Sequence, residues 1–236
     1  MEKQHYILLS IAIILAMAVL GYFIRETAIR FKEYERTVTV KGLAEQEHPA
    51  DIVIWPIQFT EAGNNLEAIY TSVEKSANIV KTFLMERGIG EEAISFSTPV
   101  MTDRSAQRYG GNENVEFRYV ATQNVTVYSS EVDKVREVMG ELVELGKRGI
   151  TLSGDEYQVR TEYLFTRLNE IKPEMIEQAT KEARQVAQKF AEDSNSRLGK
   201  IKTASQGQFS IAPRDNNTPY IKNIRVVSTI EYYLSD

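Results

Sequence analysis

Residues 40–59, VKGLAEQEHPADIVIWPIQF, decide the fold class because apolar and polar side chains alternate on both sides of a polar centre. Four apolar residues of the second half would share one face of an extended chain: Val53, Trp55, Ile57 and Phe59. The preceding residues 36–46 follow the same period of two. The stretch therefore predicts two consecutive strands. Pro56 has no N–H to donate and predicts a sheet edge or a bulge in the second strand.

The polar centre between these strands holds four side chains that bind metals or transfer protons elsewhere: Glu45, Glu47, His48 and Asp51. A calcium loop needs oxygen ligands at regular spacing and a glycine at its sharp turn, whereas this segment contains Pro49. Proline holds the preceding residue extended, which favours a hairpin connection over a metal or acid–base site. We therefore expect no metal here.

Working outward, the chain continues as strands and helices in mixed order. Period-two patterns predict strands at residues 93–102, 117–128, 156–165, 200–209 and 224–235. Apolar residues three and four apart predict helices at residues 65–88, 130–146 and 172–196. Asn64 or Asn65 should cap the first helix and Gly88 should end it. In the strand at 117–128, Gln123 is a polar exception on the apolar face.

The order β-β-α-β-β-α-β-α-β-β lacks the regular alternation of a parallel sheet. It predicts an α+β fold with largely antiparallel sheets packed with three main helices, preceded by one N-terminal transmembrane helix. We divide the chain into a short flank (1–5), a transmembrane anchor or uncleaved signal (6–24), a stalk (25–36) and one domain (37–236).

The anchor is predicted from residues 6–24, YILLSIAIILAMAVLGYFI, which carry no charge over a length that can cross a bilayer. The alternative is a cleaved secretory signal, because Ala16-Met17-Ala18 has the small-x-small form of a cleavage site. Ala12 and Ala16 form a small-xxx-small pair that allows helix association. The lipid bilayer is thus an expected partner, while the flanking charges leave the side of the membrane open.

Composition excludes several classes of function. With 236 residues and 42% hydrophobic residues, the chain can bury one large core or two small ones. A net charge of −5 without a basic stripe makes nucleic acid an unexpected partner. The absence of cysteine excludes disulfides, thiolate metal sites and a thiol nucleophile, and it suits an oxidising compartment.

The motifs in the chain do not predict catalysis. GIGEEA at residues 88–93 matches the letters of the dinucleotide fingerprint, but a helix precedes it and a strand follows, the reverse of what that site needs. There is no Walker loop, and the only histidines are His5 and His48. We therefore expect a protein that is not an enzyme, with no catalytic, cofactor, nucleotide or metal residues.

Tyrosine is the remaining candidate for a functional surface. Five of the 12 tyrosines lie late in the chain and form the possible interface: Tyr157, Tyr163, Tyr220, Tyr232 and Tyr233. Tyrosine suits interfaces because it buries area while keeping a polar tip. The same residues would equally cover a half-exposed antiparallel sheet, and the sequence leaves both interpretations open.

From residue 37 onward the chain resembles the SIMPL-domain family, formerly a domain of unknown function, which includes bacterial periplasmic and outer-membrane antigens. The matching landmarks occur in the family's order: VTVKG, HPADIVIWPIQF, FLMERGIGEEAISFSTPV, FRYVATQNVTVY, VDKVREVMGELVELG and ATKEARQVAQKFAEDSNSRLGKI. Two departures are the separation of Pro49 from Asp51, and Asn195 where the family often has glycine. Asn195 tolerates the left-handed conformation that ends a helix.

The resemblance implies an extracytoplasmic α+β domain that is homo-oligomeric, ring-like or channel-like in a relative, and linked with oxidative-stress tolerance and immunogenicity. It therefore places the main domain in the periplasm or its equivalent. The expected function is a membrane-anchored, single-pass, self-assembling protein of envelope maintenance or stress tolerance. The alternative is a periplasmic module that binds a ligand or peptide on its aromatic sheet face or near the loop at 103–116. A carboxylate- or metal-dependent hydrolase is the least favoured reading.

Overall fold

The computed structural model describes residues 13–27, 36–106, 116–154 and 160–235. The chain forms two compact units. The first unit contains residues 1–46, 169–210 and 224–236, and the second contains residues 47–168 and 211–223. Antiparallel strand pairs and helices occur as the pattern of the sequence predicted, so the α+β class is confirmed.

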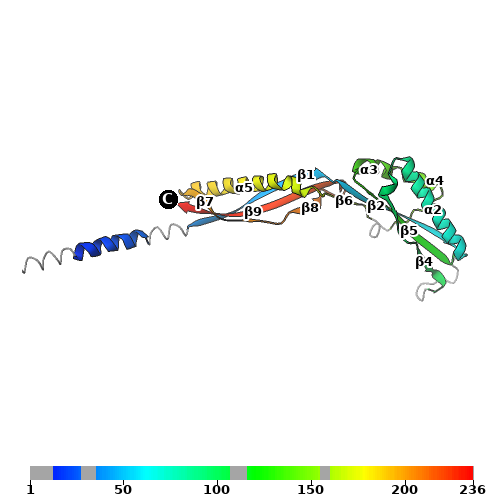
Figure 1. Cartoon of the computed structure of the whole chain (residues 1–236), viewed down its shortest axis with the longest axis horizontal. Helices are drawn as coiled ribbons and strands as arrows, with labels where there is room; N and C mark the ends of the chain where they lie inside the picture. Colours follow the sequence, from blue (N-terminus) through cyan, green and yellow to red (C-terminus); the bar gives the residue numbers. More distant parts are fainter. Residues whose placement is uncertain (1–12, 28–35, 107–115, 155–159, 236) are drawn as a thin grey trace, which may run out of the picture. The chain divides into compact units, whose positions relative to one another are not determined.

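The first unit is built on a four-stranded sheet covered by one long helix (Figure 1). Its strands follow the order β1 (Thr37–Pro49), β9 (Ile221–Ser235) and β7 (Arg197–Gln206), and β8 (Ser210–Pro213) also pairs with β9. Strands β7 and β9 are antiparallel. The covering helix is α5 (Leu168–Asp193). It starts four residues before the predicted start, which places Pro173 inside the helix.

Helix α5 approaches the sheet closely because its buried stripe is made almost entirely of alanine. The buried residues of α5 are Met175, Ala179, Ala183, Ala187 and Ala191. Val40, Ile230 and Tyr232 of the sheet complete this core. Two larger apolar residues of the helix, Val186 and Phe190, lie outside this stripe and are 41% and 56% exposed. The buried face of α5 is therefore narrow and consists mainly of small residues.

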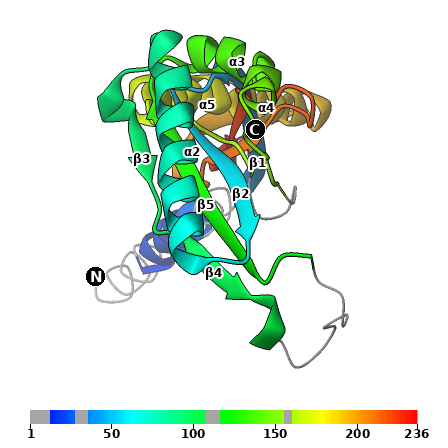
Figure 2. The same cartoon turned by 90° about the vertical axis from the view of Figure 1, so that its right-hand side faces the viewer.

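The second unit holds a five-stranded antiparallel sheet with helices packed on it (Figure 2). The strand order is β3 (Ile94–Phe96), β5 (Tyr119–Ser129), β2 (Ile52–Gly63) and β6 (Glu162–Leu164), with β4 (Val100–Asp103) also paired to β5. The helices are α2 (Leu66–Glu86), α3 (Val132–Gly140) and α4 (Val143–Lys147). There are also two short 3₁₀ helices: Glu91–Ala93 lies between α2 and β3, and Arg104–Ala106 lies between β4 and β5.

The core of the second unit lies between α2 and the central strands β2 and β5. The predicted inward face of β2 is confirmed, because its four residues are at most 4% exposed: Val53, Trp55, Ile57 and Phe59. Their partners on β5 run from Ser129 opposite Val53 to Tyr119 opposite Gly63. Gln123 is also buried, and its Nε2 donates to the carbonyl of Ser97 at 2.7 Å. The side chain of Gln123, the polar exception on the apolar face, thus joins β5 to the segment after β3 by a hydrogen bond.

The expected hairpin between the first two strands is wrong. Strand β1 belongs to the four-stranded sheet and β2 to the five-stranded sheet. The backbone N–H of Ala50 donates to Tyr220 at 2.8 Å, and that of Asp51 donates to Leu164 at 2.9 Å. The backbone N–H groups of these two consecutive residues therefore bind two different segments. The chain continues from one sheet into the other and does not form a hairpin.

Local signals for helix ends are confirmed at three positions. Asn65 caps α2 by accepting a hydrogen bond from the N–H of Ala68 at 3.0 Å. Gly88 follows that helix with φ of 78°, and Asn195 follows α5 with φ of 54°. Both are left-handed conformations, which glycine and asparagine tolerate best.

Other boundaries differ from the prediction. The strand expected at 93–102 is divided into β3 and β4, and the helix expected at 130–146 is divided into α3 and α4. Of the strand expected at 156–165, residues 155–159 lie outside the described residues, and β6 covers 162–164. Most of the loop at 103–116 also lies outside them.

The predicted N-terminal transmembrane helix is not supported, and the fold class is corrected to α+β alone. Across the described residues, no helix combines the length and the apolar composition that crossing a bilayer requires. Residues 13–27 form a helix in the described part of the chain. Ala16 lies in this helix, whereas Ala12, residues 1–11 and most of the expected stalk, 28–35, lie outside the described residues.

Candidate functional site

Asp51, the last member of the polar cluster between the first two strands, anchors a neighbouring segment. Its carboxylate accepts hydrogen bonds from the backbone N–H of Thr166 at 2.9 Å, from the Thr166 hydroxyl at 3.0 Å and from Arg167 Nε at 3.3 Å. The side chain is only 15% exposed. These contacts hold the chain that follows β6, so the position of Asp51 is explained by structure.

The other members of the cluster have separate neighbours. Glu47 forms an ion pair with Arg214 at 3.4 Å, and the ring of His48 lies 5.4 Å from the ring of Phe165. Glu45 belongs to the first unit, whereas the other three residues belong to the second. Within the described ranges, no group of three or more metal-binding side chains comes together. The arrangement fits the interpretation of a strand connection.

Two of the five tyrosines predicted to form an interface come together. The rings of Tyr163 and Tyr220 meet edge to face at 6.1 Å, and the guanidinium of Arg136 lies 3.4 Å from the centre of the Tyr220 ring. Burial is the main cause that raises the pKa of the Tyr163 phenol. Its hydroxyl contacts the sulfur of Met139 at 3.7 Å. This cluster covers one edge of the core of the second unit.

The remaining tyrosines lie elsewhere. Tyr232 is 2% exposed in the core of the first unit, and its buried hydroxyl has no hydrogen-bond partner among the described residues. Tyr233 follows it on β9 with the opposite orientation and is half-buried. Tyr157 lies outside the described residues. The five residues therefore do not form one continuous surface in the part of a single chain that is described.

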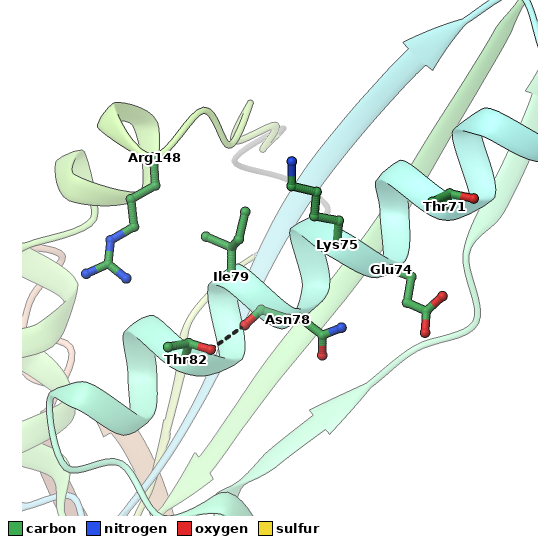
Figure 3. A pocket seen from close by; sticks show the side chains of 7 residues that line it. All are labelled: Thr71, Glu74, Lys75, Asn78, Ile79, Thr82 and Arg148. Carbon is green, nitrogen blue, oxygen red and sulfur yellow. Dashed lines mark hydrogen bonds between the residues drawn. The ribbon is translucent and has the colours of Figure 1, made fainter.

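A shallow groove of about 770 Å³ runs along the solvent side of α2 (Figure 3). Six of its residues come from successive turns of that helix, and Arg148 reaches toward them from the segment after α4. The Thr82 hydroxyl donates to the Asn78 carbonyl at 2.8 Å, and Arg148 donates to Glu86 at 2.6 Å. The Thr82 hydroxyl and Arg148 are thus already engaged in hydrogen bonds, which is typical of a solvated helix face.

Another hollow of the second unit is a cleft of about 850 Å³. Strand β6 and the loop after β8 form its walls, and its described lining residues all belong to the second unit: Arg160, Thr161, Glu162, Tyr163, Leu164, Pro213, Asp215, Asn216, Pro219 and Lys222. The lining combines charged side chains with the apolar surfaces of Leu164 and two prolines. Such a mixture is typical of sites that hold small molecules.

Lys222 is the unusual member of this lining. It is 7% exposed, and burial lowers the pKa of its ammonium group. The sequence reasoning missed this residue, although a signal is present: Lys222 shares the phase of Ile224 and Val226, the buried face of β9. Its place in the apolar phase of the strand indicated that most of this lysine side chain would be buried.

Asp215, in the same lining, is already engaged. Its carboxylate accepts hydrogen bonds from the N–H of Asn217 and of Thr218 at 2.7 Å each and from Arg214 Nε at 3.1 Å. A further hydrogen bond from the Thr218 hydroxyl is the main cause that holds the pKa of Asp215 well below its usual range. This carboxylate therefore shapes the loop after β8.

Comparison with known proteins gives one result. The model of the SIMPL family, described as a protein of unknown function (DUF541), matches residues 38–226. The match covers well over half of the chain and includes strands from both sheets. No curated protein matches the chain.

Proposed function

We propose, from the premise that the chain belongs to the SIMPL family, that it is a non-enzymatic protein that assembles with further copies of itself. We place it outside the cytoplasm, with a role in envelope maintenance or tolerance of oxidative stress. The absence of cysteine supports an oxidising compartment. A chain with two histidines and no cysteine also has few side chains suited to nucleophilic catalysis.

The observation that carries the assembly proposal is the pair of free edges of the four-stranded sheet. Strands β1 and β7 are its outer strands, so among the described residues each is paired on one side only. Backbone N–H and C=O groups on such an edge pair readily with a further strand. Contact between β7 of one copy and β1 of the next is head to tail, and it forms a ring if the rotation closes.

Two features locate the contact more closely. Strand β7 is exposed along nearly its whole length, and register shifts on both sides of Ile201 interrupt its pairing with β9. Such bulges disfavour regular pairing at that point. We therefore expect the second copy to pair with residues 203–206, while Ile201 and Leu43, which are 48% and 40% exposed, supply apolar contacts.

Native mass measurement of the full chain at micromolar concentration tests this proposal. We expect a defined oligomer, and we expect Leu43→Lys and Ile201→Lys each to weaken association by roughly tenfold or more, about 1.4 kcal/mol. Val186→Lys is the matched control, because Val186 is similarly exposed but lies on α5. A monomeric parent chain, or equal weakening by all three substitutions, would contradict assembly through the sheet edges.

A second candidate function is the binding of a small molecule or peptide, which the sequence predicted for the aromatic sheet face or the region near the loop at 103–116. The specific observation in its favour is the cleft of about 850 Å³ beside Tyr163. A thermal-shift screen tests it, because any ligand that binds only the native state raises the unfolding midpoint. The two functions are compatible, since the free sheet edges and the cleft involve different residues.

A further inference from the structure

Lys222 carries a charge that the described structure leaves uncompensated. Of the lysine, arginine, histidine, aspartate and glutamate side chains in the described ranges, Lys222 alone is less than 9% exposed. No hydrogen bond or ion pair joins its Nζ to another described residue, and burial is the one cause of its lowered pKa. Because burial of the side chain weakens the hydration of its ammonium group, Lys222 is suited to pair with a negatively charged group that enters the cleft.

The charges around the cleft decide which partner fits. Besides Lys222, the lining contributes the exposed cation Arg160 and the carboxylates Glu162 and Asp215. Arg214 offsets the charge of Asp215 through the contact described above. Among the described lining residues, two cations therefore face one uncommitted carboxylate, and this balance favours an anion.

The apolar part of the lining restricts the anion further. Leu164 is 38% exposed, and Pro213 and Pro219 also line the cleft. Inorganic anions gain nothing from such surfaces, whereas an organic acid buries its apolar stem on them. A carboxylate on an apolar stem combines both features, and it is shared by small organic acids and by the C-terminal residue of a peptide.

We propose that the cleft between β6 and the loop after β8 binds an organic carboxylate, with Lys222 as its ion-pair partner and Arg160 as a second cation. This proposal rests on the second candidate function, ligand binding, and does not depend on assembly. It identifies the chemical class of the ligand. The ion pair keeps Lys222 protonated, and the stem covers Leu164 and the prolines.

Calorimetric titration of the full chain tests the proposal with benzoate as the probe and benzyl alcohol as the neutral analogue. We expect saturable binding of benzoate and at least tenfold weaker binding of benzyl alcohol. N-acetylphenylalanine and its amide form the second pair, which distinguishes a peptide-like carboxylate from a small organic acid. Inorganic phosphate should bind more weakly than benzoate.

Substitutions then assign the binding to the cleft. Lys222→Met keeps an apolar stem of similar length and should weaken benzoate binding by roughly tenfold or more. Lys181→Met is the control, because Lys181 is an exposed residue of α5 in the first unit. Arg160→Gln alters an exposed side chain and should also weaken binding, which keeps the test valid if Lys222→Met fails to fold.

The pH dependence of the parent chain provides an independent readout. Benzoate affinity should fall as the pH rises through the pKa of Lys222, because the neutral amine no longer attracts a carboxylate. Among the described residues, the other titratable or charged groups that line the cleft are Arg160, Glu162, Asp215 and Tyr163. Burial raises the pKa of the Tyr163 phenol, which is the opposite direction to the shift of Lys222.

The outcomes distinguish failure of the proposed anion site from failure of ligand binding as a function. If benzoate and benzyl alcohol bind equally and Lys222→Met changes neither, the cleft binds ligands but the assignment of an anion is overturned. If neither probe nor the peptide pair binds, the anion site is overturned, and a thermal-shift screen that also finds no ligand removes ligand binding as a function. Loss of benzoate binding in Lys222→Met, with Lys181→Met unchanged, supports the site.

Discussion

Gly42 of β1 lies directly against the backbone of Ala179 on α5. A Cβ atom built on Gly42 would overlap the carbonyl oxygen of Ala179 and would stand 2.5 Å from the backbone nitrogen of Ala183. Strand and helix therefore meet at the level of their backbones, which the alanine stripe of α5 makes possible. Neither backbone can move aside as a flexible side chain could, so the first unit depends on the absence of a side chain at this position.

Gly42→Ala should destabilise the protein by about 3 kcal/mol or more, because one added methyl group must push α5 away from the sheet. Gly140→Ala is the matched control, since a Cβ at Gly140 meets no atom within 4 Å. That substitution should be neutral or stabilise by up to about 1 kcal/mol. Urea unfolding of the two variants measures the difference, and a Gly42→Ala protein as stable as the parent would contradict the close approach.

The left-handed residue after α5 gives a second prediction. Asn195 has φ of 54°, and the N–H of Ser196 donates to the Ala191 carbonyl at 2.8 Å, closing the helix end. Asn195→Gly should leave stability unchanged or raise it slightly, whereas Asn195→Val should cost roughly 1–2 kcal/mol because a β-branched residue resists this conformation. Denaturation midpoints compare the pair. Equal stability of the two variants would show that the left-handed conformation is not required.

Local patterns explain why much of the fold is predictable. The inward faces of β2 and β5 follow from period-two alternation, and the ends of α2 and α5 follow from Asn65, Gly88 and Asn195, whose effects act within one turn. The partner of each strand depends on contacts distant in sequence. For this reason the period-two alternation correctly predicts that β1 and β2 are strands. It does not predict that they belong to different sheets, so the expected hairpin is wrong.

The candidate site is less predictable for the same reason. Lys222 is surrounded by β6 and the loop after β8, which are separated from each other in sequence. Only its phase with Ile224 indicates burial, and nothing local indicates a cleft. In contrast, the cluster around His48 is prominent in the sequence, yet the fold directs its members to separate neighbours. Proximity along the chain is therefore weak evidence for a shared site.

Asp51 should prove structural. Asp51→Ala removes the acceptor for the Thr166 N–H and hydroxyl and for Arg167, and should cost about 1–3 kcal/mol. Asp51→Asn keeps one acceptor oxygen and should cost less. Glu47→Ala, which loses one exposed ion pair, should stay within about 0.5 kcal/mol of the parent. Chemical denaturation provides the comparison, and an Asp51→Ala chain of unchanged stability would refute the anchoring role.

Glu231 links three strands of the first sheet and predicts acid sensitivity. Hydrogen bonds from Thr37 of β1 and from Thr203 of β7, followed by that from Lys202, lower the pKa of its carboxyl group below the ordinary value of 4.5. The folded state therefore binds fewer protons than the unfolded state just below that value. The stabilisation is complete above pH 4.5 and is lost as the pH falls through the lowered pKa.

Glu231→Gln should thus reduce stability at neutral pH, and the difference in unfolding free energy between variant and parent should shrink on acidification. Urea unfolding across this pH range measures it, with exposed Glu182→Gln on α5 as the control. A difference that is constant with pH would mean that ionisation of Glu231 does not stabilise the sheet.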